Sequence, residues 1–89
     1  MSILTETTEM AMTEREKEWA GKATRFIKVE LKRAGIGYRE LAQRLNDHGL
    51  EGETEDAIAS KLARGTYSAT WLLAVLTVLE IEALTLAAL

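Results

Sequence analysis

The stretch "TEDAIASKLARGTYS", residues 54–68, decides the fold of this chain. Thr54 is a favoured residue at the start of a helix, because its hydroxyl can accept a hydrogen bond from a backbone amide that has no partner inside the helix. Ile58 and Leu62 are four residues apart and therefore share one face. Gly65 suits the left-handed conformation that ends many helices. The stretch predicts a short helix with one inward face, closed by a turn.

The whole chain has the composition of a small globular protein built from helices. It has 89 residues, of which 47% are hydrophobic and 28% are charged, and it contains six glycines and no proline. This length supports one domain with a modest core. The absence of cysteine excludes disulfides and thiolate metal sites, and a single histidine excludes a multi-histidine site within one chain. The sequence also shows no catalytic constellation and no sign of a cofactor, so we expect no enzyme activity, no metal and no cofactor. The lack of cysteine fits a reducing compartment, and we expect a cytoplasmic location.

The two ends of the chain differ in character. Residues 1–12 lack lysine, arginine and a continuous apolar run, so they predict a short flexible tail, and residues 13–89 are predicted to form a single helical domain. The last nineteen residues, from Trp71 onward, are mostly apolar, but Glu80 and Glu82 lie in their middle. Each carboxylate would cost about 2.5–3.5 kcal/mol at the centre of a bilayer, so we expect a buried helix and no membrane span.

The first helix is predicted between Thr13 and Gly35. Thr13 and Glu16 have the spacing of a capping box, in which the hydroxyl accepts from one backbone amide and the carboxylate from another. Glu30 lies near the middle of the apolar face, so we expect it to have a cationic or amide partner or to lie at the edge of the core. The residues that helical spacing predicts to face the core are Trp19, Ala23, Phe26, Ile27, Leu31 and Ala34.

The opposite side of this helix is predicted to be basic. Residues 14–33 contain seven lysines and arginines against four glutamates, a net charge of +3, whereas the whole chain carries −3. Such a face is either simply solvated, or it contacts phosphates or an acidic partner. The cations on it are Lys22, Arg25, Lys28, Lys32 and Arg33.

Two further helices complete the predicted bundle. One covers residues 38–47, and the other covers residues 69–79 and is capped by Ser68. The second of these is apolar on nearly every side, so we expect it to be the central helix, buried on more than one side and shared across a dimer. Residues 80–89 fit either a short fifth helix or an extended segment, and we favour the helix.

Two segments carry a resemblance to a known family. The segments "LKRAGIGYRELAQRL", residues 31–45, and "IASKLARGTYSATWLLAVLTVLEI", residues 58–81, resemble the lambda-repressor and Cro type of helix-turn-helix domain. The "ARGTYSA" part also resembles a small bacterial domain family of unknown function. The resemblance implies an all-α fold, a compact bundle of four to five helices in a repressor-like helix-turn-helix arrangement. It further implies a DNA-binding transcriptional regulator whose partner is duplex DNA.

The same resemblance implies which residues meet DNA, at base edges in the major groove or at the phosphate backbone. Glu55 and Asp56 share the front of the same helix. The basic face of the first helix would add phosphate contacts if it lies close enough. The residues implied as the DNA-binding set are Tyr38, Arg39, Thr54, Ala57, Ser60, Lys61, Arg64 and Thr66.

A second function stays open, because the edge that would approach DNA is acidic. Glu51, Glu53, Glu55 and Asp56 surround the start of the helix, whereas phosphate-driven affinity requires lysine and arginine. One carboxylate at such an edge can still accept a hydrogen bond from cytosine. The alternative is a protein-interaction or dimerisation module on the same fold without DNA binding. For both functions we expect a homodimer that forms through the apolar C-terminal region.

Overall fold

Four α-helices and one short 3₁₀ helix make up the described part of the protein. The structure is a computed structural model that describes residues 13–89. The predicted all-α fold class is confirmed, whereas the predicted tail at residues 1–12 lies outside the described residues. Within residues 13–89, no helix is both long enough and apolar enough to cross a bilayer. The elements are α2 (Glu14–Ala34), α3 (Tyr38–Asp47), α4 (Glu55–Arg64), α5 (Ala69–Val78) and η1 (Leu86–Ala88).

Local hydrogen bonds determine where α2 and α4 begin. The Thr13 hydroxyl accepts from the Glu16 amide at 3.1 Å, and the Glu16 carboxylate accepts from the Thr13 amide at 3.0 Å. The Thr54 hydroxyl accepts from the amide of Ala57 at 3.0 Å. These bonds satisfy amides that a helix leaves unpaired at its first turn. The predicted capping box and the predicted cap at Thr54 are therefore confirmed.

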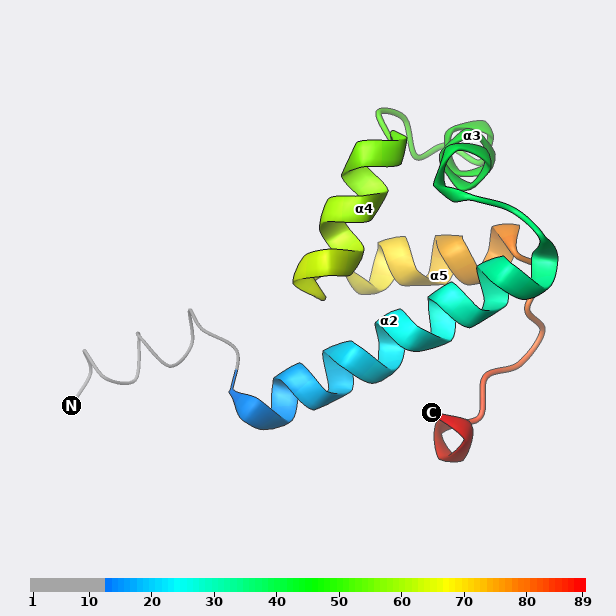
Figure 1. Cartoon of the computed structure of the whole chain (residues 1–89). Coiled ribbons are helices and arrows are strands. Elements are labelled where there is room, and N and C mark those ends of the chain that lie inside the picture. The colour runs from blue at the N-terminus through cyan, green and yellow to red at the C-terminus, as the bar shows by residue number, and fades with distance from the viewer. Residues whose placement is uncertain (1–12) are drawn as a thin grey trace, which may run out of the picture.

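The helices surround a single core (Figure 1). α3 packs against both α4 and α5. The long α2 crosses the lower part of the view in Figure 1, and its N-terminal end extends beyond the other three helices. Because α2 is 21 residues long and each of the other helices has 10, only part of α2 can be covered. The N-terminal part of α2, up to Trp19, is therefore exposed to solvent.

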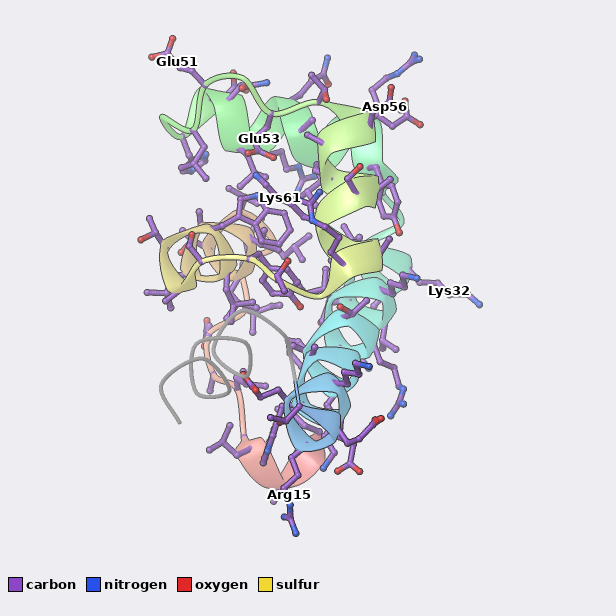
Figure 2. The ribbon with its side chains drawn as sticks, turned by 90° about the vertical axis from the view of Figure 1, so that its left-hand side faces the viewer. Arg15, Lys32, Glu51, Glu53, Asp56 and Lys61 are labelled. Atoms are coloured by element: carbon purple, nitrogen blue, oxygen red, sulfur yellow. The ribbon has the colours of Figure 1, made fainter. Side chains whose placement is uncertain are left out.

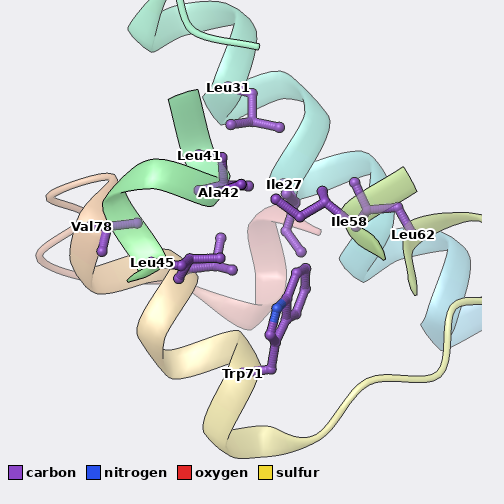
Figure 3. Packing of buried hydrophobic residues seen from close by; sticks show 10 residues of the cluster. Ile27, Leu31, Leu41, Ala42, Leu45, Ile58, Leu62, Trp71 and Val78 are labelled. Atoms are coloured by element: carbon purple, nitrogen blue, oxygen red, sulfur yellow. The ribbon is translucent and has the colours of Figure 1, made fainter. Parts of the chain in front are cut away.

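The core contains hydrophobic side chains from all four helices, which converge in Figure 3. Burying a side chain of this size contributes about 1.5–3 kcal/mol, so the core is the main source of stability. Within the described residues, no buried side chain is polar or charged. The buried residues are Ile27, Leu31, Leu41, Ala42, Leu45, Ile58, Leu62, Trp71, Val75 and Val78.

Four positions of the predicted apolar stripe of α2 lie outside the core, and two of them, Ala23 and Phe26, are half-buried. Trp19 is 56% exposed, and Ala34 is exposed at the end of the helix. Helical spacing identified the correct side of α2, but it could not show that neighbouring helices cover only the middle of that side.

The prediction for Glu30 is confirmed, because its carboxylate lies 3.1 Å from the guanidinium of Arg33 and is mostly shielded from solvent.

Within one chain, the prediction that α5 is buried on more than one side is wrong, whereas its sharing across a dimer stays a prediction. Trp71, Val75 and Val78 are buried on one face, whereas Leu73 is 63% exposed on the other. α5 packs against α3, and the described residues supply no second layer beyond it. The outer side of α5 therefore lies at the surface, where Leu73 is exposed together with Ala69, Thr70 and Thr77.

The expected fifth α-helix is also corrected. Glu80 has a φ of 60°, which is the left-handed conformation that ends a helix, and the amide of Ile81 donates to the carbonyl of Leu76 at 3.0 Å. The chain then runs without regular structure until the three-residue η1. Sequence periodicity allowed both interpretations, and the extended one describes most of residues 81–89.

Gly65 is required at the end of α4 for two separate reasons. Its φ is 70°, and a Cβ atom at this position would lie 2.8 Å from the Cβ of Ala20 on α2. We expect Gly65→Ala to lower the free energy of unfolding by about 2–3 kcal/mol, because left-handed strain costs about 1–2 kcal/mol and overpacking adds about 1 kcal/mol or more. Urea unfolding followed by circular dichroism measures this loss.

Gly35→Ala is the matched control for this prediction. Gly35 has a φ of 75°, but an added Cβ would have no atom within 4 Å. Its substitution should therefore cost only the strain of about 1–2 kcal/mol. Equal losses in the two variants would show that the close approach of Gly65 to Ala20 has no energetic effect.

Candidate functional site

The turn between α3 and α4 directs one of its acidic residues inward. The carboxylate of Glu53 accepts hydrogen bonds from the Lys61 ammonium at 2.6 Å and from the Trp71 indole N–H at 3.2 Å. The side chain of Glu53 is 10% exposed and that of Lys61 is 27% exposed. Figure 2 shows Glu53 and Lys61 facing each other between the turn and α4. The charge of Lys61 is therefore neutralised by Glu53 and not displayed to a ligand.

Further contacts hold Glu53 in this position. The Asn46 side-chain amide donates to the Glu53 carbonyl at 3.1 Å and accepts from the Glu53 amide at 3.2 Å. The Lys61 ammonium also lies 5.2 Å from the centre of a Trp71 ring, within the range of a cation–π contact. Residues of α3, α4 and α5 thus meet at Glu53, which makes this cluster a structural junction.

The other acidic residues of this region stay at the surface. Glu51 and Asp56 are exposed and point away from the helices (Figure 2). Glu55 is also exposed, and its carboxylate lies 3.7 Å from the guanidinium of Arg39. An exposed pair at this distance contributes little, but it reduces the positive charge that Arg39 displays. The front of α4 therefore keeps a negative character.

The residues of the predicted DNA-binding set lie in different environments. Tyr38 packs against the core, the Thr54 hydroxyl caps α4, and Ala57 is half-buried. Lys61 is bound to Glu53, as described above. The exposed members of the set are Arg39, Thr54, Ser60, Arg64 and Thr66. Of the three cations in the predicted set, only Arg39 and Arg64 are exposed.

The predicted basic face of α2 is largely exposed. Arg25, Lys28, Lys32 and Arg33 are exposed, whereas Lys22 is half-buried. The Lys22 ammonium lies 4.8 Å from the centre of the Trp19 ring. In Figure 2, Arg15 of α2 lies at the opposite end of the molecule from Glu51 and Asp56. Arg15 therefore lies far from the acidic front of α4.

A shallow hollow of about 330 Å³ lies between α2 and the C-terminal end of α4. Lys17 and Arg64 line it, and its lining contains no acidic residue among residues 13–89. Most of its other lining residues are small, including Ala20, Gly21 and Ala63. Two cations beside exposed small residues form a surface that an anion can approach closely.

The outer face of α5 carries no charge. The sequence contains no lysine, arginine, aspartate or glutamate between Arg64 and Glu80. Leu73 is exposed on this face, and Leu72 and Leu76 are half-buried beside it. Ala69, Thr70 and Thr77 are also exposed on α5, so this uncharged face presents Leu73 beside two threonines. A face without charged groups can be covered by another protein without removing a charge from water.

Sequence reasoning missed the contact of Glu53 with Lys61. Residues eight positions apart that belong to a turn and a helix have no spacing rule that brings them together. The bond from Trp71 to Glu53 spans 18 positions. The only signal in the sequence was the surplus of acidic residues near Thr54, which did not indicate which of them turns inward. Within residues 13–89, no group of histidine and acidic side chains is arranged to hold a metal ion.

The chain matches the model of a known domain family. The model of the family described as "Domain of unknown function (DUF6471)" matches residues 19–84. This range runs from the second turn of α2 past the end of α5 and covers well over half of the sequence, so the chain belongs to this family. No curated protein and no solved structure matches the chain. The resemblance to a domain family of unknown function is confirmed, and the helix-turn-helix resemblance stays a prediction.

Proposed function

We propose that this member of the DUF6471 family is a protein-interaction domain that forms a homodimer through the outer face of α5. The observation that carries the proposal is Leu73, a side chain 63% exposed within a segment of fifteen uncharged residues, 65–79. Removing apolar surface from water contributes about 25 cal/mol per Å². On this face no charged group has to lose its hydration when a second molecule covers it.

Symmetry supports a second copy as the occupant of this face. In a two-fold dimer, each patch meets the same patch of the other subunit. The basic side of α2 would bring cations against cations, and the turn before α4 would bring Glu51 and Asp56 against their own copies. The uncharged face of α5 meets itself without such repulsion. A domain of this size also buries only about 60% of the surface of its unfolded chain, so an interface adds useful burial.

Replacing Leu73 with glutamate tests the proposed homodimer. We expect Leu73→Glu to weaken self-association by at least about 100-fold, because each subunit would place an unpaired carboxylate in the interface. The measurement is the molar mass from light scattering or sedimentation over a range of concentrations.

Leu86→Glu is the matched control, because Leu86 is a leucine of η1 that is also exposed. It should leave the mass of the dimer unchanged. A native chain that stays monomeric at every concentration would overturn the proposed homodimer. So would a Leu73→Glu variant that dimerises as well as the native chain.

DNA binding is the second candidate function. The observation that favours it is the hollow between α2 and α4, where Lys17 and Arg64 lie together without an acidic residue in the lining. Arg39 adds an exposed cation at the start of α3. The negative front of α4 and the neutralised Lys61 count against it, which is why it ranks second.

Salt dependence of binding separates the two candidates. If the domain binds duplex DNA, anisotropy with mixed genomic fragments should show an affinity that falls steeply with salt. Arg64→Ala should then weaken binding more than Lys61→Ala, since Glu53 already neutralises Lys61. A folded protein that shows no anisotropy change at low salt would exclude this candidate and leave the homodimer proposal untouched.

A further inference from the structure

One side of α2 presents large apolar side chains to solvent, away from the face of α5. Trp19 is 56% exposed and Val29 is 45% exposed, and Phe26 between them is half-buried. The separations of seven and three residues correspond to about two turns and one turn, so the three side chains follow one side of the helix. Exposed aromatic residues at this spacing are typical of a helix that receives another helix.

A groove of about 300 Å³ follows this side of α2. Phe26 and Val29 line it on α2, and Leu89 from the C-terminal segment lines it as well. Lys22 and Arg33 lie toward its two ends, eleven residues or about 16 Å apart along the helix axis. We call this region the α2 groove.

The α2 groove has a positive rim. Lys22, Arg25 and Arg33 supply three cations, against a single carboxylate from Glu30. Glu30 is paired with Arg33 at 3.1 Å, whereas Arg25 is exposed and forms no ion pair within residues 13–89. The combination of an apolar floor with a net positive rim differs from the uncharged face of α5. An apolar floor with a positive rim favours a ligand that has an apolar side flanked by negative charges.

We propose that the α2 groove binds an acidic amphipathic helix of a partner protein. The leucine-like side chains of that helix cover Phe26 and Val29 and pack beside Trp19. Its carboxylates lie next to Arg25 and the other two cations of the rim. Charge complementarity selects this partner over a second copy through the same face, because the rim would then meet its own cations. The inference does not depend on the homodimer, since α5 contributes no residue to the groove.

A synthetic peptide of about four helical turns serves as the probe. It carries leucines at helical spacing on one side, glutamates flanking them and alanines elsewhere, with a fluorescent label. One control peptide has lysine in place of every glutamate, and another has glutamine in place of every leucine. Anisotropy titrations with the full-length chain should show at least about tenfold tighter binding of the acidic peptide than of either control, because only this peptide complements both the floor and the rim.

Variants of the protein locate the binding site. We expect Arg25→Glu to weaken binding of the acidic peptide about tenfold and Phe26→Ala to weaken it about 30-fold, because both residues line the groove. Lys28→Glu makes the same charge change at an exposed residue that does not line the groove. It should weaken binding by less than about threefold, because salt screens charges that do not touch the ligand.

Three results would overturn the proposal. The first is equal binding of the acidic and the lysine peptides. The second is a loss in Lys28→Glu as large as that in Arg25→Glu, which would indicate general charge attraction. The third is native-like binding by Phe26→Ala with its fold confirmed by circular dichroism. The Leu73→Glu variant should bind the peptide like the native chain, so a failure of the homodimer proposal would be recognised separately.

Discussion

Trp71→Ala is expected to lower the free energy of unfolding by about 3–5 kcal/mol, a large part of the 5–15 kcal/mol that stabilises a typical domain. Trp71 is 4% exposed, and its ring centroid lies 5.0 Å from that of Tyr67. Its indole N–H also donates to Glu53. Truncation therefore removes core packing, an aromatic contact and a hydrogen bond together. Urea unfolding monitored by circular dichroism measures the loss.

Trp19, the other tryptophan of the chain, is the control for this prediction. Trp19 is 56% exposed, so Trp19→Ala should change the stability by only about 0.5 kcal/mol. A third variant, Trp71→Phe, keeps most of the ring but cannot donate to Glu53, and it should lose about 1–2 kcal/mol. Similar losses in Trp71→Ala and Trp19→Ala would contradict the burial described for these two residues.

Glu53→Ala is expected to lower the free energy of unfolding by about 2–3 kcal/mol, although Glu53 lies in a turn. The substitution leaves the mostly covered Lys61 ammonium without its carboxylate and the Trp71 indole N–H without its acceptor. Glu51→Ala is the matched control, because Glu51 is an exposed glutamate of the same turn, and it should change stability by about 0.5 kcal/mol or less. The same urea experiment compares the two variants.

A double-mutant cycle isolates the contact of Glu53 with Lys61. Lys61→Met keeps an apolar side chain of similar length over Trp71 but removes the charge. We expect the sum of the two single-variant losses in the free energy of unfolding to exceed the loss of the double variant by about 1–2 kcal/mol, because the effects of residues in direct contact are not additive. Additive losses would show that Lys61 and Glu53 do not stabilise each other.

Parts of the candidate surfaces could be predicted from the sequence, and parts could not. The basic face of α2 and the uncharged run before Glu80 are visible in the residue types alone. The sequence did not show which apolar residues of α2 and α5 stay exposed. Trp19 was expected to face the core and α5 to be buried on more than one side, but Trp19 and Leu73 are both exposed. The DNA-binding set changed for a different reason. Lys61 was correctly placed on α4, but its partner Glu53 comes from the preceding turn.

The sequence by itself determined where most helices begin and end. Caps at Thr13, Thr54 and Gly65 act through hydrogen bonds and backbone angles within a few residues, so local residue types are sufficient for them. Only the tertiary structure decided which side of each helix is covered and which charge is neutralised. Those outcomes depend on distances between segments far apart in the chain, and the separation of 18 positions between Glu53 and Trp71 has no counterpart in any local pattern.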